Sequence, residues 1–213
     1  MGFEMESNLM NGYMEAFNMA CSSLCLRDPA DIVRNSDAKY DGSARTYALP
    51  YMNILHLVDC AAGTVSRMDP EGPAPAGTTV GVLILHYLLH AVKRPLSGKL
   101  ISFREVRGVS GYFPTFQKRA ILPLQGTFEG RPDTLVKAGL ALGGETAGYG
   151  DASTTLRIFP LVPVTYVVWR GDEEIPAGAT ILFDESITSY LPGEDIVLAA
   201  SFGSYALMKR AKG

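Results

Sequence analysis

The sequence predicts an α+β fold: a single domain in which a mixed or antiparallel sheet packs with several helices. Helical and alternating hydrophobic periods both occur, and they do not follow the strict strand–helix alternation typical of a parallel sheet. In addition, 213 residues with a hydrophobic fraction of 47% suffice for one substantial core. We therefore expect one globular domain spanning residues 1–213.

The N-terminal segment, residues 1–27, is expected to form a methionine-rich amphipathic helix. Apolar side chains recur at helical intervals from Phe3 to Leu26, and five of the eight methionines lie within the first 19 residues. Methionine adapts to irregular surfaces, so this face is a candidate docking surface for a partner protein or a second copy of the chain. Ordinary core packing is the alternative interpretation.

A short helix and a β-rich segment follow. Asp28 and Pro29 have the pattern of an N-cap followed by proline at the first helical position, which predicts a helix through Asn35. Residues 45–68 alternate β-favouring with small or polar residues, which indicates a hairpin or meander turning at residues 61–63.

Prolines and periodicity set the elements expected in the rest of the chain. Residues 68–77 should form a loop, because their three prolines cannot donate to a regular β-ladder. The strand predicted over residues 164–170 is apolar enough to be central in its sheet. The elements expected after the loop are a helix over residues 78–93 capped by Thr78 or Thr79, a strand over 100–106, a helix over 114–122 stopped by Pro123, a helix over 132–142, strands over 154–159 and 164–170, and a last helix from Glu194 to Arg210.

The charges are distributed unevenly along the chain. The segment from Lys93 to Arg119 contains seven basic residues and one acid, Glu105, whereas the whole chain has a net charge of −3. One basic segment in a mildly acidic protein indicates a local anion site rather than a nucleic-acid-binding surface. No nucleic-acid partner is therefore expected.

The same composition bears on location. The N-terminus lacks the basic and apolar regions of a secretion signal, and no apolar run reaches the length of a membrane span. Cys21, Cys25 and Cys60 cannot all pair with one another, so reduced thiols in a reducing compartment fit best. We expect a cytoplasmic protein without a membrane anchor.

The basic segment supplies the candidate ligand-binding residues. Arginine presents a planar fork to carboxylate or phosphate, lysine adds a point charge, and interleaved aromatic rings suit a flat conjugated anion. A solvated basic face that pairs with the protein's own acids is the alternative. The candidate ligand-binding residues are Lys99, Arg104, Arg107, Tyr112 and Arg119.

Two histidines in the predicted helix form a second candidate site. His86 and His90 stand four residues apart, so both imidazoles could share a divalent metal or a tetrapyrrole iron. The sequence offers no further ligand nearby and no HExxH pattern, because Tyr87 follows His86. Histidines at the edge of an apolar core are the alternative interpretation.

Acidic residues form a third candidate group. Asp151 and Asp184 could act as acid and base or hold a cation. Aspartates that cap turns at strand ends are the commoner case.

Several motifs in order resemble those of a known family. They are LILHYLLHA, KLISFRE, GYFPTFQKR, LGG followed by YGDA, WRGDEE and ILFDESITSYLPGEDI. On these motifs the chain resembles the bacterial and archaeal family called domain of unknown function 3786, over roughly residues 28–209. The resemblance implies an association with anaerobes and no established reaction.

The resemblance also bears on cofactors. Some members of that family carry an additional cysteine-rich module of iron–sulfur type, but the cysteines of this chain are not clustered in that way. No iron–sulfur cluster is expected, and no other cofactor follows from the sequence. In the family pattern the position of His86 is commonly histidine, whereas that of His90 is more often basic.

Two functional hypotheses follow. The first is a cytosolic ligand-binding or accessory protein that accepts a small anionic molecule in a basic, aromatic-lined cleft. The alternative is an enzyme that acts on a carboxylated or phosphorylated small molecule with His86 as general base, assisted by Asp151 or Asp184.

Overall fold

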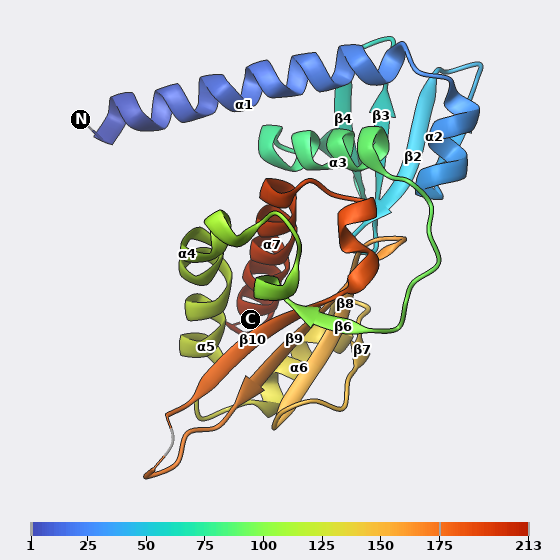
Figure 1. The fold of residues 1–213 in the computed structure, drawn as a ribbon. Coiled ribbons are helices and arrows are strands. Elements are labelled where there is room, and N and C mark those ends of the chain that lie inside the picture. Colours follow the sequence, from blue (N-terminus) through green and yellow to red (C-terminus); the bar gives the residue numbers. More distant parts are fainter. Residues whose placement is uncertain (1, 175, 213) are drawn as a thin grey trace. The chain divides into compact units, whose positions relative to one another are not determined.

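The computed structural model describes the backbone of residues 2–174 and 176–212, and the side chains from Asn11 onward within those ranges. The fold combines helices with two antiparallel five-stranded sheets, so the predicted α+β class is confirmed. The chain divides into two compact units, unit 1 (Met1–Lys93) and unit 2 (Arg94–Gly213), each with its own sheet (Figure 1). That both units form a single domain stays a prediction.

In unit 1 the long first helix runs beside the histidine-containing helix. Helix α1 (Gly2–Cys25) confirms the predicted N-terminal helix, and it lies along α3 (Thr78–His90) (Figure 1). A Cβ atom on Gly81 would lie 2.6 Å from the Phe17 ring, so glycine allows this close approach. Cys21 and Leu24, near the end of α1, are buried.

Helix α2 (Pro29–Ser36) begins as the sequence predicts and ends one residue later than expected. The Asp28 carboxylate accepts a hydrogen bond from the Ala30 N–H at 2.9 Å, which caps the helix. At its other end, the Tyr87 hydroxyl of α3 donates to the Ser36 carbonyl oxygen at 2.8 Å. This buried bond fastens α2 to α3.

The sheet of unit 1 is a meander in strand order β1-β2-β3-β4-β5. The strands are β1 (Lys39–Asp41), β2 (Thr46–Tyr51), β3 (Ile54–Asp59), β4 (Thr64–Asp69) and β5 (Gly72–Pro75). The predicted loop over residues 68–77 was wrong, because residues 72–75 pair with β4. Their prolines are tolerated since β5 is an edge strand, where one row of N–H groups has no partner strand.

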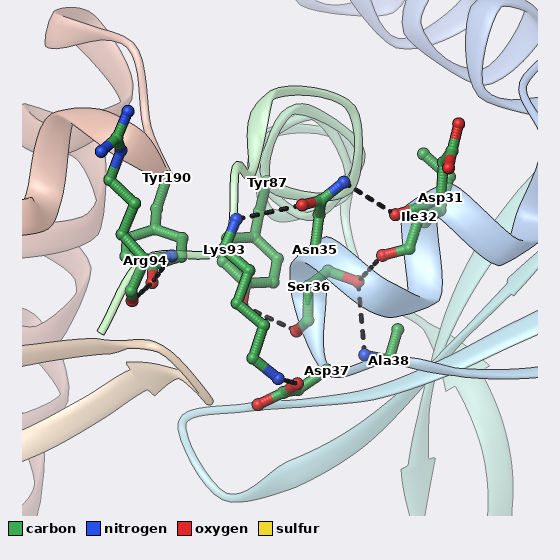
Figure 2. A network of polar contacts seen from close by, with 10 residues as sticks. All are labelled: Asp31, Ile32, Asn35, Ser36, Asp37, Ala38, Tyr87, Lys93, Arg94 and Tyr190. Atoms are coloured by element: carbon green, nitrogen blue, oxygen red, sulfur yellow. Dashed lines mark hydrogen bonds and ion pairs between the residues drawn. The ribbon is translucent and has the colours of Figure 1, made fainter. Parts of the chain in front are cut away.

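Helix α3 starts at Thr78 and ends at His90, earlier than expected. Its N-cap is Gly77, with no side-chain cap, so the prediction that Thr78 or Thr79 caps the helix was wrong. Beyond α3, the Lys93 N–H donates to the Asn35 side-chain oxygen at 3.1 Å and its ammonium pairs with Asp37 (Figure 2). These contacts tie the end of unit 1 to α2.

Unit 2 contains a sheet in strand order β6-β10-β9-β8-β7. Its strands are β6 (Leu100–Ser102), β7 (Glu145–Thr146), β8 (Ala152–Phe159), β9 (Val162–Trp169) and β10 (Gly178–Asp184). Strands β8 and β9 confirm the two strongest strand predictions, and β9 is central as expected. The strand predicted over residues 100–106 ends at Ser102, where a 3-10 turn, η1 (Phe103–Glu105), begins.

The helical segment after η1 is longer than predicted. A 3-10 turn, η2 (Ser110–Tyr112), leads into α4 (Phe113–Phe116), a π-helical turn, η3 (Gln117–Ile121), and α5 (Leu122–Phe128). Pro123 was expected to stop this helix, but it lies within the first two residues of α5. The widened turn accommodates it: the Leu122 N–H bonds five residues back, to the Gln117 carbonyl oxygen.

The remaining helices confirm their predictions. They are α6 (Asp133–Ala141) and α7 (Gly193–Lys212), with a 3-10 turn, η4 (Glu185–Ser189), between β10 and α7. The Tyr166 hydroxyl of β9 donates to the Ala200 carbonyl oxygen of α7 at 3.1 Å. Arg94, the first residue of unit 2, exchanges hydrogen bonds with the buried Tyr190 through its own N–H and carbonyl groups (Figure 2).

Across the described parts of the chain, no helix combines the length and apolar character needed to cross a membrane.

Candidate functional site

A groove in unit 2 contains one of the predicted arginines beside aromatic rings. The groove has a volume of about 300 Å³ and lies between η1, the α4–η3–α5 segment and the start of β10. We call it the Arg104 groove. Its wall includes Arg104, Phe113, Gln117, Leu122, Gln125 and Thr180.

Stacked phenylalanines form the apolar wall of the Arg104 groove. Phe103 of η1 and Phe116 of α4 stack with ring centroids 4.1 Å apart and planes 10° apart. The ring centroid of Phe183 in β10 lies 6.2 Å from that of Phe103 and 6.1 Å from that of Phe116. All three rings are buried, so Phe103 and Phe116, which line the groove, belong to the tightly packed core of unit 2.

Arg104 lies on this wall in a cation–π contact. Its guanidinium carbon is 3.6 Å from the centroid of the half-buried Phe113 ring. The contact orients a planar, permanently charged group while leaving its N–H donors at the groove. No carboxylate pairs with Arg104 within the residues that the structure describes.

The acid nearest in sequence is engaged elsewhere. The Glu105 carboxylate accepts hydrogen bonds from the Ser102 N–H at 2.8 Å and from the Ser102 hydroxyl at 2.7 Å. These bonds lower the pKa of Glu105 below its ordinary value and stabilise the first turn of η1. The one acid of the basic segment therefore serves as a cap.

The polar side of the groove comes from residues that sequence reasoning missed. The Gln125 side-chain N–H donates to the Ala177 carbonyl oxygen at 2.8 Å, which joins α5 to the segment before β10. Thr180 lines the groove from β10 itself. Nothing in the local sequence pattern indicates either residue, because each reaches the groove through tertiary packing.

Arg107 and Lys99 lie at a different surface of unit 2. Arg107 lines a second cavity of about 280 Å³ together with Glu105, Glu185 and Thr188. The Lys99 ammonium pairs with the Glu185 carboxylate at 2.8 Å, and this contact raises the pKa of Lys99. Arg107 and Lys99 therefore lie beside glutamates, and this second cavity carries charges of both signs.

Tyr112 and Arg119 complete the predicted set. Tyr112 is 41% exposed, and a Cβ atom on Gly193 at the start of α7 would lie 3.6 Å from its ring. Arg119 is exposed on the π-helical turn and, among the residues described, makes no ion pair. The structure thus assigns Arg104 and Arg107 to separate cavities rather than bringing all five residues around one.

Asp184 has a clear structural role. Its carboxylate accepts hydrogen bonds from the N–H groups of Ser97, Gly98 and Ser186 at 3.0, 2.8 and 2.9 Å. Burial alone would raise the pKa of Asp184, but the bonds from Ser186, Ser97 and Gly98 outweigh burial and lower it. An ionised carboxylate with this many donors fastens a loop and is a poor proton acceptor.

Asp151 also joins backbone segments. Its exposed carboxylate accepts a hydrogen bond from the Arg170 N–H at 2.6 Å, and its own N–H donates to the Val168 carbonyl oxygen at 3.0 Å. These bonds link the start of β8 to the end of β9.

The two histidines lie in unit 1, whereas Asp151 and Asp184 lie in unit 2. The His86 and His90 rings face each other edge to face with centroids 5.8 Å apart, the first half-buried and the second exposed. Among the residues described, no group of three or more His, Cys, Asp or Glu side chains could hold a metal ion. The hypothesis of His86 as a general base stays a prediction.

The methionine-rich helix is described in part. Met14 and Met19 are exposed on α1, and the Thr78 hydroxyl donates to the Met14 sulfur at 3.4 Å. The side chains of Met5 and Met10 lie outside the described residues. Docking of a partner or a second copy through this helix stays a prediction.

Comparison with known proteins identifies the family to which the chain belongs. No curated protein and no solved structure matches the chain. A family model described as Domain of unknown function (DUF3786) matches residues 28–205, which is most of the 213 residues. This match confirms the resemblance carried by the sequence motifs. The chain belongs to the DUF3786 family.

Proposed function

We propose that the protein is a cytosolic binding or accessory protein whose unit 2 holds a small anion with a flat conjugated part in the Arg104 groove. The carboxylate, sulfonate or phosphate of the ligand pairs with the Arg104 guanidinium. Its planar part packs against the apolar wall near Phe113 and Leu122. The three free cysteines of the chain are in keeping with a reducing compartment.

The observation that carries this proposal is the position of Arg104. Its guanidinium is held 3.6 Å over the Phe113 ring at the edge of a groove of about 300 Å³. An arginine that only made the surface soluble would need neither the aromatic support nor the adjoining apolar wall. The charge is available to a ligand because Glu105, its sequence neighbour, is bound to Ser102.

A pair of fluorescent probes that differ in charge tests the proposal. Anilinonaphthalene sulfonate is a conjugated anion with a flat naphthalene ring, and phenylnaphthylamine is its uncharged counterpart. We expect the anion to bind more tightly, and Arg104→Gln to weaken its binding about tenfold, or about 1.4 kcal/mol, while affecting the uncharged probe little.

Arg107→Gln is the matched control for this experiment. It removes the same charge from an exposed arginine of the same segment that lines the other cavity. We expect the anion to bind this variant within about twofold of the unchanged protein, a difference of less than about 0.5 kcal/mol. Equal weakening by both substitutions would mean that the anion senses only the net charge, and the proposal would fail.

A further inference from the structure

The three cysteines of the chain meet at one place in unit 1. Cys21 and Cys25 lie one turn apart near the end of α1, and Cys60 follows β3 directly. The Cys25 thiol donates to the Cys60 carbonyl oxygen at 3.7 Å, and Cys25 is close enough to both other cysteines to raise the pKa of each. Cys25 is therefore the middle member of the group.

Backbone hydrogen bonds hold Cys60 in position beside α1. Its N–H donates to the Arg45 carbonyl oxygen at 3.1 Å. The preceding Asp59 carboxylate accepts hydrogen bonds from the Ala61 and Ala62 N–H groups at 2.8 and 2.9 Å, which orders the turn. Cys60 thus approaches Cys25 from a structured turn.

The thiols differ in their access to solvent, and the pKa values of Cys21 and Cys60 are raised. Cys21 is only 6% exposed, whereas Cys25 and Cys60 are half-buried. Burial, together with the nearby Cys25, raises the pKa of Cys21 to about 11 and the pKa of Cys60 to about 12. Two charged neighbours act in opposite directions, because Asp59 raises the pKa of Cys21 and Arg45 lowers that of Cys60.

Helix geometry selects which pair of thiols can be joined. Side chains four residues apart on a helix have Cβ atoms about 5–6 Å apart, whereas a disulfide needs about 3.5–4.5 Å. Joining Cys21 to Cys25 would therefore distort α1. Cys60 belongs to a different element and approaches Cys25 without this constraint.

We propose that Cys25 and Cys60 form a reversible disulfide by exchange with a low-molecular-weight disulfide such as oxidised glutathione. The Cys25 thiolate attacks one sulfur of the reagent, the S–S bond of the reagent breaks, and one glutathione leaves and takes up a proton. The Cys60 thiol gives its proton to solvent and attacks the Cys25 sulfur, which releases the second glutathione. Two electrons pass from the protein to the reagent, whose disulfide becomes two thiols.

The product fastens the end of α1 to the turn between β3 and β4. These two cysteines are 35 residues apart in the chain, so the bond closes a substantial loop in the unfolded state and stabilises unit 1. Cys21 remains a buried thiol. The site is thus an oxidisable modification site with a structural consequence.

The test uses the full chain incubated with oxidised glutathione, followed by alkylation of the remaining thiols and mass-spectrometric peptide mapping. We expect a Cys25–Cys60 linkage in the unchanged protein. Cys21→Ser should retain the linkage, and Cys25→Ser should lose it. Mapping of the unchanged protein stays decisive even where a variant folds poorly.

Other outcomes would overturn the proposal. They are a product that carries only glutathione adducts, a linkage between Cys21 and Cys25, or loss of the linkage in a folded Cys21→Ser protein. Thermal unfolding gives a second measurement: oxidation should raise the midpoint of the unchanged protein and of Cys21→Ser by several degrees, and reduction should reverse the shift. An unchanged midpoint of thermal unfolding in the cross-linked protein would contradict the stabilisation of unit 1 by the disulfide.

Discussion

Burial and hydrogen bonding separate the charged residues of unit 2 into different roles. Asp184 is 4% exposed and accepts hydrogen bonds from the N–H groups of two backbone segments, so its charge is engaged within unit 2. Arg104 is exposed and supported from one side by Phe113, so its donors remain available. Both residues stand out in the sequence, but only their surroundings distinguish a fastening role from a binding role.

Asp184→Asn should destabilise the protein by about 2 kcal/mol at neutral pH, because an amide cannot replace the charge-assisted hydrogen bonds. The folded-state pKa of Asp184 lies below its unfolded value of 3.8. The stabilisation is therefore present above pH 3.8 and is lost as the pH falls through the lower folded-state value. Denaturant unfolding at neutral and acidic pH would measure both effects.

Asp151→Asn is the control for this substitution. Its exposed carboxylate accepts one hydrogen bond, from the Arg170 N–H, so we expect a loss below about 1 kcal/mol. If Asp184→Asn and Asp151→Asn lowered the free energy of unfolding equally, the loop-fastening role assigned to Asp184 would be incorrect.

At the level of helices and strands, local patterns predicted the elements whose own residues carry the signal. The apolar run of β9 and the charged ends of α7 are examples. Strand β5 was missed because its prolines look like loop residues, and only its place at a sheet edge makes them acceptable. Strand β10 was missed because its apolar core, Ile181 to Phe183, is short and its partners come from elsewhere in the chain.

The same limit applies to the Arg104 groove. Arg104 and its aromatic neighbours could be predicted, because they are close in sequence and combine charge with apolar rings. Gln125 and Thr180 could not, since the π-helical turn and β10 determine where they lie.

Helix α7 packs closely enough on β9 to require a glycine. A Cβ atom on Gly203 would lie 1.8 Å from the Tyr166 hydroxyl oxygen, which is itself bonded to Ala200. Gly203→Ala should therefore cost about 3 kcal/mol of stability. Gly126→Ala is the matched control in α5, where a Cβ atom meets nothing within 4 Å, and it should stabilise by about 0.5–1 kcal/mol. Denaturant unfolding compares them, and an unaffected Gly203→Ala protein would contradict the close packing.

At the scale of the whole molecule, the expectation of a single domain can be tested with a natural probe. Trp169 is the one tryptophan of the sequence, and it lies in β9 of unit 2. Its fluorescence reports on unit 2, whereas far-ultraviolet circular dichroism reports on both units. A single domain should give coincident unfolding curves by the two methods.

Separate curves would show that the two units unfold independently, and the single-domain expectation would then be wrong. Guanidinium titrations of the full chain with both probes on one sample provide the measurement. Gly203→Ala serves as an internal check, because it weakens unit 2 and should shift the fluorescence curve in either case.

The prolines of β5 also affect whether the sheet edges of two molecules can pair. An edge strand normally offers a row of free N–H and C=O groups to which a strand from another molecule can add, and such pairing leads to aggregation. Pro73 and Pro75 have no N–H group to offer, and β5 is only four residues long. The two prolines that make β5 look like a loop in the sequence therefore disfavour the addition of a strand from another molecule at this edge of the unit 1 sheet.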